Sequence, residues 1–402
     1  MNNTFRAFQN RNYTLFFTGQ SVSQIGTWMQ KTSVSWVIYT MTGSSLMLGL
    51  SIFASQFPSF LFSLYGGVVA DRYNRHKILL ITQLASMLQA IVLAVLTLLN
   101  HYVVWEILTL SVFLGIINAF DVPARQPLVH QLVTNKEDLP NALALNSSMV
   151  NLAKLIGPAL SGIVLEIFGA GICFLSNALS FVAVIISLLL MKLPAQHFPP
   201  VKKKITTELS ESMLYLKNSK TIRIAILMLS LLSLFVLSYE TILPIFAKEI
   251  FKGDAATYGY IRSFIGLGAI GGTFLLASLK SGTDLKIVLL INSIILGIGL
   301  IFFSHISYFP FAMVFAVLIG FGAMSQTTIL LTIVQIETEE LMRGRIMGFI
   351  AMAFFGMLPI GSLFIGSISK QIGAPNTIFC QGILTLIIVA SFSGFLRKGT
   401  LV

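Results

Sequence analysis

Long apolar stretches separated by short polar ones follow one another along nearly the whole chain. A helix needs about 20 mostly apolar residues to cross the hydrocarbon layer of a bilayer. Stretches of that length occur twelve times, and each predicts a membrane-spanning helix. The predicted limits are 14–40, 46–69, 78–99, 103–124, 142–167, 171–192, 222–247, 256–279, 284–304, 309–334, 345–368 and 376–396. These stretches lack the strict alternation of barrel strands, so the predicted fold class is an all-α membrane protein.

The composition favours a membrane setting. Of the 402 residues, 55% are apolar and 10% are charged, and the mean hydropathy is +0.87. Soluble proteins carry about 25% charged residues. Because a surface this poor in charge aggregates in water, the chain is predicted to be an integral, multi-pass membrane protein in contact with lipid.

The distribution of Lys and Arg predicts the orientation of the chain. These residues are retained on the cytoplasmic side of a membrane. Twelve spans place both termini on one side, and the loops of that side hold most of the positive charge, whereas the opposite loops hold only Lys248, Lys252 and Lys370. We therefore expect a protein of the inner (cytoplasmic) membrane with both termini in the cytoplasm. The net charge of +11 then reflects topology, and no nucleic-acid partner is expected.

An internal repeat relates the two halves of the chain. Residues 156–162 resemble residues 360–366, and their glycines match without a gap. Two further pairs match in the same order, namely Lys77 with Lys286 and Gly115 with Gly320. In a parallel repeat of six-helix halves, the substrate path lies at their interface near the middle of the bilayer.

The longest polar stretch separates these halves. Residues 193–221 contain three prolines and the run Lys202-Lys203-Lys204, and an amphipathic helix is expected from Ile205 to Lys220. The predicted organisation is a six-helix half at 1–192, a cytoplasmic linker at 193–221 and a second six-helix half at 222–402.

Residues suited to metal or covalent chemistry are not grouped in the sequence. Cys173 and Cys380 lie in separate apolar stretches, the histidines lack ligand spacing, and no G-x-x-x-x-G-K-[ST] loop is present. We expect no metal, no cofactor and no catalytic residue. A membrane-embedded enzyme is disfavoured, because no cluster of His, Asp or Ser lies at one membrane depth.

The loop between the second and third spans is the sharpest local motif. Gly67 allows close approach of helices, and Asp71 stands at a helix end, where a carboxylate accepts hydrogen bonds from free backbone N–H groups. Arg72, Arg75 and Lys77 then pair with acids or lipid phosphates. From these residues alone, an ordinary positively charged turn remains the alternative.

This loop resembles the G-x3-D-R-x-G-R-[RK] motif of the major facilitator superfamily. Asn74 stands at the usual second glycine and is expected to tolerate a left-handed backbone, and His76 stands at a usual basic position. Residues 157–162 resemble the motif typical of the exporters of the superfamily. Four segments resemble the branch of enterobactin-type siderophore exporters and macrolide-efflux-type proteins, namely 119–126, 138–142, 151–158 and 343–347.

The resemblance covers the whole chain and implies a fold of twelve helices in two pseudo-symmetric halves. It also implies a cytoplasmic gate, in which Asp71, Arg75 and Asp121 lie together near Arg345. In this interpretation Asp121 pairs with Arg75, and Arg125 follows Asp121 by one helical turn. The small residues around Gly157, Pro158 and Gly162 are expected to serve helix packing rather than chemistry.

Ionisable groups deep in a span are costly, so they usually have a partner or face a wet cavity. Five are present, namely Lys31, Asp121, Lys154, Glu240 and Arg262. Lys31 ends a polar stripe with Gln20 and Gln24, and Lys154 continues one with Asn151. We predict that these residues and Gln326 line the substrate cavity. Structural pairing between helices is the alternative.

Glu240 is the acid expected to exchange protons. It lies inside the seventh span, four residues before the helix-breaking Pro244, and burial there is expected to raise the pKa of its carboxyl group. A fixed ion pair, for example with Arg262, and an exposed position in an outer cavity are the alternatives.

These observations predict a secondary active transporter that works as a monomer. We expect proton-coupled efflux of an amphipathic small organic molecule, a drug or a siderophore, by alternating access of the two halves. An importer or metabolite carrier of the same fold is the closest alternative. A membrane enzyme and a scaffold that transports nothing are less consistent with the gate motif and the charges inside the spans.

Overall fold

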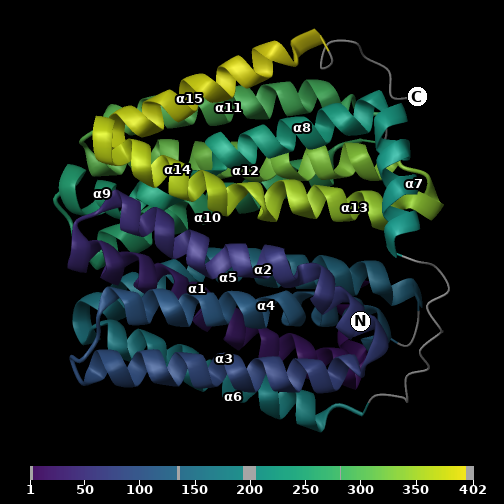
Figure 1. The fold of residues 1–402 in the computed structure, drawn as a ribbon, viewed down its shortest axis with the longest axis horizontal. Helices are drawn as coiled ribbons and strands as arrows, with labels where there is room; N and C mark the ends of the chain where they lie inside the picture. Colours follow the sequence, from purple (N-terminus) through teal and green to yellow (C-terminus); the bar gives the residue numbers. More distant parts are fainter. Residues whose placement is uncertain (1–2, 134–135, 193–204, 281, 395–402) are drawn as a thin grey trace. The chain divides into compact units, whose positions relative to one another are not determined.

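The computed structural model describes residues 3–133, 136–192, 205–280 and 282–394, and every regular element within them is helical (Figure 1). The run Lys202-Lys203-Lys204 and the C-terminal Arg397 and Lys398 lie outside the described residues.

The first six spans follow one another with short connections. A 3-10 helix, Asn3–Gln9, precedes them, and another, Lys136–Asp138, precedes the fifth. The spans are α1 (Arg11–Thr42), α2 (Ser45–Arg72), α3 (Arg75–Leu98), α4 (Val104–Leu132), α5 (Leu139–Phe168) and α6 (Ala170–Leu190). Their limits agree with those predicted, except that α4 continues past residue 124 through Pro123 and Pro127.

The second half of the chain contains α7 (Ile205–Asn218), where an amphipathic helix was expected, and then six spans. Two of these spans are broken and consist of several pieces. The elements are α8 (Lys220–Phe235), η3 (Leu237–Ile242), α9 (Leu243–Ile245), η4 (Phe246–Ile250), α10 (Ala255–Ser278), α11 (Leu285–His305), α12 (Phe309–Glu337), α13 (Glu340–Phe355), α14 (Met357–Ile372) and α15 (Ala374–Ser391).

Eleven helices in the described residues are long and apolar enough to cross a membrane. The remaining expected span, α1, is 32 residues long, which is ample for a crossing at 1.5 Å per residue. Its composition is more polar because Gln20, Gln24 and Lys31 lie along it. The prediction of an all-helical membrane protein with these spans is confirmed.

The break in the seventh span has a local cause. Pro244 has no N–H group and its ring clashes with the preceding turn, so it disfavours a regular α-helix here. The chain instead forms a 3-10 helix over Leu237–Ile242 and one wide turn over Phe246–Ile250. Glu240 therefore stands on an irregular stretch and not on a regular helix.

The chain divides into two compact units. Unit 1 comprises residues 1–43, 54–199 and 253–263, and unit 2 comprises residues 44–53, 200–252 and 264–402. Helices α2 and α10 are each divided between the units. The first turns of α2, up to residue 53, belong to unit 2 and the rest of α2 belongs to unit 1. The first turns of α10, up to residue 263, belong to unit 1 and the rest of α10 belongs to unit 2.

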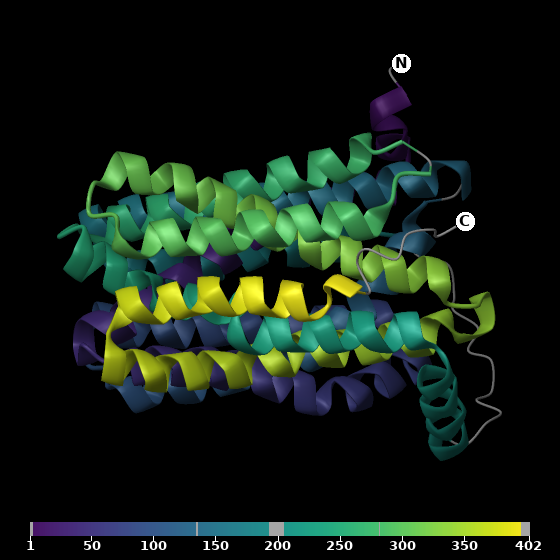
Figure 2. The same cartoon turned by 90° about the horizontal axis from the view of Figure 1, so that it is seen from above.

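Glycines of the internal repeat allow equivalent helices of each unit to approach closely. In unit 1, a Cβ atom on Gly157 of α5 would lie 2.6 Å from Cβ of Trp28 on α1. In unit 2, a Cβ atom on Gly361 of α14 would clash with the carbonyl oxygen of Leu234 on α8, and Figure 2 shows α8 beside α14. The repeat seen in the sequence is therefore a repeat of helix packing.

Candidate functional site

The loop between α2 and α3 is a helix cap held by its own side chains. The side chain of Asn74 accepts hydrogen bonds from the backbone N–H groups of His76 (3.0 Å) and Lys77 (3.3 Å). Its φ of −62° is not left-handed, so the expected reason for an asparagine here is wrong, and capping of α3 is the observed reason. Arg75 pairs with Asp71 at 3.2 Å and donates to the carbonyl oxygen of Ala70 at 3.1 Å.

Close packing next to this loop involves Gly66 and not Gly67. A Cβ atom on Gly66 would clash with the carbonyl oxygen of Ala119 on α4, whereas one on Gly67 would meet nothing within 4 Å. The expectation that Gly67 brings helices together is therefore corrected by one residue. The contact joins α2 to α4 just before the segment that carries Asp121.

Asp121 is buried and is the centre of a polar network in unit 1. It accepts hydrogen bonds from Thr82 (2.9 Å) and Gln83 (2.7 Å) of α3 and pairs with Arg125 at 3.3 Å. Arg125 in turn donates to Gln20 of α1 at 3.3 Å. The expected pair of Asp121 with Arg75 is absent among the described residues, because Asp121 pairs with Arg125 one helical turn away and Arg75 pairs with Asp71 across the loop between α2 and α3. Gln20, predicted for the cavity, belongs to this network.

Arg345 belongs to unit 2, where its side chain pairs with Glu211 of α7 at 2.8 Å. A second contact joins the same helix to the loop before α13, because the backbone N–H of Glu339 donates to the hydroxyl group of Tyr215 at 3.1 Å. Helix α7 runs across the direction of the unit 2 spans in both views (Figures 1 and 2). The sequence identified Arg345 but not Glu211, which is part of a helix recognised only by its amphipathic pattern.

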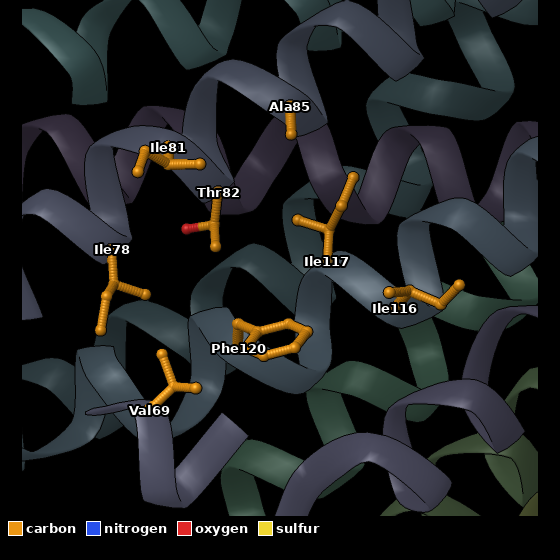
Figure 3. Close-up of a pocket in the computed structure, with 8 residues that line it drawn as sticks. All are labelled: Val69, Ile78, Ile81, Thr82, Ala85, Ile116, Ile117 and Phe120. Carbon is orange, nitrogen blue, oxygen red and sulfur yellow. The ribbon is translucent and has the colours of Figure 1, made fainter. Parts of the chain in front are cut away.

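An apolar groove lies beside the Asp121 network (Figure 3). Val69 of α2, Ile78, Ile81 and Thr82 of α3, and Phe120 of α4 are among its lining residues. Thr82 contributes the only oxygen-bearing side chain among the lining residues, and its hydroxyl group is bonded to Asp121. No charged group lines the groove, so it is poorly matched to a charged substrate.

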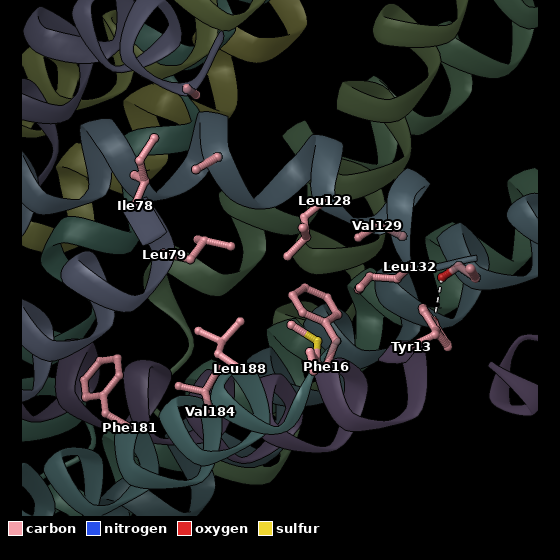
Figure 4. Packing of buried hydrophobic residues seen from close by; sticks show 14 of the residues in the cluster. Tyr13, Phe16, Ile78, Leu79, Leu128, Val129, Leu132, Phe181, Val184 and Leu188 are labelled. Atoms are coloured by element: carbon pink, nitrogen blue, oxygen red, sulfur yellow. Dashed lines mark hydrogen bonds between the residues drawn. The ribbon is translucent and has the colours of Figure 1, made fainter. Parts of the chain in front are cut away.

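Buried apolar side chains hold the helices around this network in place (Figure 4). Phe16 of α1, Leu79 of α3, Leu128 of α4 and Leu188 of α6 are part of one cluster. The hydroxyl group of Tyr13 donates to the carbonyl oxygen of Ala142 on α5 at 2.8 Å, so α5 is tied to the same core. The helices that carry the charged groups of unit 1 are therefore packed tightly against one another.

Three cationic side chains converge on one indole ring in unit 1. Nζ of Lys31 lies 4.7 Å from the ring centroid of Trp28, and Nζ of Lys154 lies 5.6 Å from it. Cζ of Arg262 lies 5.6 Å from the same centroid and 5.9 Å from that of Tyr258. A cation within about 6 Å of an aromatic face is attracted by the negative face of the ring. We call Trp28, Lys31, Lys154 and Arg262 the cation–indole cluster.

Close packing of three helices produces this cluster. Gly157 of α5 lies against Trp28, and a Cβ atom on Gly162 would lie 2.8 Å from the carbonyl oxygen of Ala255 at the start of α10. One turn further along α10, a Cβ atom on Gly259 would lie 2.5 Å from the carbonyl oxygen of Pro158. Helix α5 therefore packs closely against both α1 and α10.

Hydrogen bonds and ring contacts hold this arrangement. The hydroxyl group of Ser263 donates to the carbonyl oxygen of Leu155 at 2.8 Å. The guanidinium group of Arg262 donates to the hydroxyl oxygen of Thr32 at 3.3 Å, and Tyr258 stacks on Trp36 with ring centroids 6.0 Å apart. Lys31 is exposed, whereas Lys154 and Arg262 are half-buried. The cluster therefore presents positive charge at an accessible surface.

The other residues predicted for the cavity are distributed between the units. Gln24 is half-buried on α1, and Asn151 is buried on α5 one turn from Lys154. Gln326 lies on α12 in unit 2, is fully buried, and has no hydrogen-bond partner for either amide atom. Glu240 is exposed, so the expected burial of its side chain is not observed.

Sequence reasoning missed that Arg262 joins Lys31 and Lys154 in the cluster. Arg262 was noted as a charge inside a span, but nothing linked it to Trp28. The available signal was the spacing of three residues between Trp28 and Lys31, which places both on one face of a helix.

Comparison with known proteins agrees with this fold. The family model described as transmembrane secretion effector matches residues 2–398. A staphyloferrin A transporter of Staphylococcus aureus is 26% identical over 95% of this chain and 96% of its own. The macrolide efflux protein A of Streptococcus pyogenes is 22% identical over 96% of each chain. A crystal structure of a POT family transporter in complex with 5-aminolevulinic acid superposes with a TM-score of 0.77 at 13% identity and covers 97% of each chain.

The family match spans nearly the whole chain, and the relatives are transporters, not enzymes. Their helical architecture agrees with the spans and the repeat described above. The chain therefore belongs to the transmembrane secretion effector family of the major facilitator superfamily, and it is a multi-pass membrane transporter.

Proposed function

We propose that this transporter exports an amphipathic small organic molecule, a drug or a siderophore, in exchange for protons. The cation–indole cluster is the observation that carries the substrate part of this proposal, because it offers positive charge and an aromatic face within one patch. The names of two relatives, a staphyloferrin A transporter and a macrolide efflux protein, support cargo of this size and an outward direction.

The cluster lies at middle depth on its helices, where an alternating-access carrier binds its substrate. Lys31 stands 20 residues after the first residue of α1, Arg11, in a helix of 32 residues. In this proposal Gln24, Asn151 and Gln326 add neutral hydrogen-bonding groups to the path, and the protein works as a monomer.

Proton exchange is assigned to Glu240. Its side chain is exposed and stands on the irregular stretch before Pro244. The coupling would then link protonation in unit 2 to substrate binding in unit 1.

The gate is assigned to the charged ends of both units, which we place at the cytoplasmic face of the inner membrane with both termini. In unit 1 it comprises the Asp71–Arg75 pair and the Asp121–Arg125 pair. In unit 2 it comprises Arg345 and Glu211. Arg72 is exposed beside Asp71 and is suited to contact lipid phosphates.

Purified protein in proteoliposomes tests the proposal. Liposomes with a pH-sensitive dye inside are exposed to a panel of drugs and siderophores, with and without an imposed pH gradient. We expect at least one compound to move uphill against its gradient while protons move the opposite way, and empty liposomes to show neither flux. Transport of a panel compound that ignores the pH gradient would overturn proton coupling. Uptake in the same direction as proton entry would overturn export.

A further inference from the structure

We propose that the apolar groove formed by α2, α3 and α4 binds one acyl chain of an anionic phospholipid, whose phosphate group is held by Arg72 and Lys77. The lipid comes from the surrounding membrane and is not the cargo. This inference therefore goes beyond the proposed export function, and it stands or falls independently of the substrate and of proton coupling.

The groove opens on a face of unit 1 that is suited to contact hydrocarbon. Exposed apolar side chains recur at helical spacing along α3, and they include Ile81, Leu84, Leu88 and Val95. Ile81 is 67% exposed and also lines the groove, so the groove and this face are continuous. Water is a poor occupant, because it needs several polar partners and the lining is apolar. A hydrocarbon chain is the occupant that this setting favours.

The size of the groove suits one chain better than a drug-sized molecule. Its cavity volume is about 280 Å³. Pockets for drug-sized ligands have roughly 300–1,000 Å³ and enclose most of the ligand. On α3 the lining extends from Ile78 to Ala85, which is about 10 Å at 1.5 Å per residue. One leaflet accounts for roughly 15 Å of the hydrocarbon core, so the groove can follow one chain over much of that depth.

Two exposed cations stand at the end of the groove where α2 ends and α3 begins. Arg72 follows the lining residue Val69 by three positions on α2. Lys77 precedes the lining residue Ile81 by four positions on α3. Residues three or four positions apart lie on one face of a helix, so each cation is on the same face as a part of the lining. A phosphate above the groove is therefore within reach of both helices.

The other charged and polar groups of this loop have partners inside unit 1. The carboxylate of Asp71 pairs with Arg75 at 3.2 Å, which offsets its repulsion of a phosphate. A ring nitrogen of His76 lies 2.7 Å from the carbonyl oxygen of Leu188, within hydrogen-bonding distance. Tyr73 is 62% exposed, and tyrosines are enriched at the level of lipid headgroups. The loop thus presents a net positive charge at the depth where phosphate groups lie.

The charges make the site selective for an anionic headgroup. A guanidinium group such as that of Arg72 matches a phosphate with two parallel hydrogen bonds, and Lys77 adds a compact charge. A zwitterionic lipid has a cation of its own beside the phosphate, and Arg72 and Lys77 repel that cation. Each basic residue near a membrane surface favours anionic lipid by about fivefold.

A chain in the groove would also stabilise the Asp121 network. The hydroxyl group of Thr82 lines the groove and donates to Asp121 at 2.9 Å, and Phe120 lines it next to Asp121 (Figure 3). A chain lying there packs against α3 and α4 together and removes apolar surface from contact with water or detergent. Binding of the lipid is therefore expected to raise the Tm of the protein.

Lipid titration of the purified protein tests the site. The protein is depleted of lipid in detergent and titrated with dioleoylphosphatidylglycerol, an anionic phospholipid, while Tm is recorded and bound lipids are counted by native mass spectrometry. Dioleoylphosphatidylcholine has the same chains without net charge. Glycerol 3-phosphate has an anionic phosphate without chains.

We expect a saturable rise in Tm with phosphatidylglycerol, a midpoint at least about tenfold higher with phosphatidylcholine, and no saturable rise with glycerol 3-phosphate. The double variant R72Q/K77Q should raise the phosphatidylglycerol midpoint about tenfold or more and remove the preference for the anionic lipid. R11Q/K192Q removes two exposed cations elsewhere in unit 1 and is the matched control, so its midpoint should equal that of the wild type.

Ala85→Leu tests the contact with the chain. Ala85 lines the groove, and the larger side chain takes up space there without changing any charge. We expect the phosphatidylglycerol midpoint to rise severalfold, whereas Ala85→Ser, which leaves the space open, should keep the wild-type value. Size-exclusion profiles establish that each variant is folded. If Ala85→Leu is not, Ile81→Asn replaces it, because it adds a polar group at an exposed position of the lining and should have the same effect.

Three results would overturn the proposal. Equal midpoints for the two lipids, or a wild-type midpoint in folded R72Q/K77Q, would exclude the phosphate contact. A saturable response to glycerol 3-phosphate equal to that of the lipid would show an anion site that needs no chain. A wild-type midpoint in folded Ala85→Leu and Ile81→Asn would place the lipid outside the groove. These measurements use no cargo and no pH gradient, so their failure is distinct from a failure of the export proposal.

Discussion

The two units treat equivalent buried polar positions differently. Asp121 follows Gly115 by six residues, and Gln326 follows the matching Gly320 by six residues. Likewise, Gln83 follows Lys77 by six residues, and Asn292 follows the matching Lys286 by six. In unit 1 the two positions form a network, in which Gln83 donates to Asp121 at 2.7 Å. In unit 2 neither amide atom of Gln326 has a hydrogen-bond partner among the described residues, whereas Gln83 and Asn292 are alike in that the side-chain oxygen of each has none there.

A charge accounts for this difference. Asp121 accepts several hydrogen bonds at once and is compensated by Arg125, whereas the position equivalent to Arg125 in unit 2 is the buried Leu330. A charged centre of this kind holds α3 and α4 in one arrangement. The neutral amide of Gln326 in unit 2 has no hydrogen-bond partner within the described part of the chain, and an unsatisfied buried polar group costs about 1–3 kcal/mol. The repeat has kept the packing glycines and has diverged in polar chemistry.

A second network adds to the same contrast. In unit 1 Gln30 of α1 donates to Gln89 of α3 at 3.0 Å and accepts from Asn177 of α6 at 2.7 Å. In unit 2 the amide side chain of Gln381 on α15 donates to the carbonyl oxygens of Phe235 and Val236. The side-chain oxygen of Gln381 has no hydrogen-bond partner among the described residues. Unit 1 is thus joined by side-chain networks across three helices, and the irregular stretch lies in unit 2.

The contrast is tested most strongly by removing its charged centre. Asp121→Ala leaves Arg125 without its partner and removes the acceptor for Thr82 and Gln83. We expect the free energy of unfolding to fall by about 3–5 kcal/mol, as for other broken buried pairs, with transport lost. Thermal unfolding in detergent measures this. Asp121→Asn keeps the shape and should lose less, and a wild-type Tm for Asp121→Ala would show that the network does not hold unit 1 together.

Glu240→Gln tests whether unit 2 contains the proton site. The variant fixes the neutral state of the side chain, so the carrier can still change conformation but cannot couple to protons. We expect efflux driven by a pH gradient to be abolished, and exchange of labelled for unlabelled substrate at equal concentrations to continue. Flux in proteoliposomes distinguishes the two. Uphill transport at the wild-type rate with unchanged pH dependence would make Glu240 structural and move the search for coupling to Asp121.

Asp71→Asn tests the exposed Asp71–Arg75 ion pair of the gate independently of the buried Asp121–Arg125 pair. The side chain of Asp71 is 68% exposed, so its ion pair with Arg75 adds little stability. We expect expression and Tm to stay near those of the wild type, while transport falls about tenfold through a weakened contact at the loop. Arg72→Gln, next to Asp71 and without that ion pair, is the control. Equal loss in both variants would point to the net charge of the loop.

Gln326→Leu tests the unit 2 side of the comparison. Replacing a buried amide that binds nothing by an apolar side chain of similar size should raise the free energy of unfolding by about 1 kcal/mol. Gln83→Leu, at the position matching Asn292, should lower it, because Gln83 donates to Asp121. Transport by Gln326→Leu then decides the role of the residue. Unchanged transport would remove Gln326 from the substrate path, and lost transport in a stabilised protein would support its place there.

The spans and the repeat could be predicted because both depend on local patterns in the sequence. A run of apolar residues specifies a crossing without reference to its neighbours, and even the irregular seventh span was signalled by Pro244. Contacts between helices could not be predicted in this way. Whether Arg262 meets Trp28 depends on how α10 is rotated against α5, and Gly162 and Gly259 determine that through backbone contacts far apart in sequence.

The residues of the gate show the same limit of prediction from sequence. Asp71, Arg75, Asp121 and Arg125 were identified from the sequence motifs, but Asp121 was predicted to pair with Arg75. Asp121 instead pairs with Arg125 within α4, and Arg75 pairs with Asp71 across the loop between α2 and α3. A pairing four residues along a helix is geometrically always available. The resemblance to the family identified the residues of the gate, whereas the partner of each residue became known only from the structure.

The smallest expected effect concerns the start of α10, the helix that contributes Arg262 to the cation–indole cluster. Asp254 caps this helix, since its carboxylate accepts from the backbone N–H of Thr257 at 2.9 Å and from its hydroxyl group at 3.1 Å. Burial raises the pKa of Asp254, but these hydrogen bonds and one with Glu166 outweigh it, so the pKa lies below its ordinary value. A lowered pKa in the folded state contributes stability above the unfolded value near 3.8, and this contribution is lost as pH falls through the folded pKa. Since the side chain is exposed, we expect the wild-type protein to lose only about 1 °C of Tm for this reason below roughly pH 4. Asp254→Asn keeps the cap, because asparagine caps helices about as well as aspartate, but it removes the charge, so its Tm at neutral pH should lie about 1 °C below that of the wild type. The difference in Tm between the two proteins, followed from pH 7 to pH 3, should therefore narrow or reverse in favour of the variant, and a difference independent of pH would show that Asp254 acts through shape and not through charge.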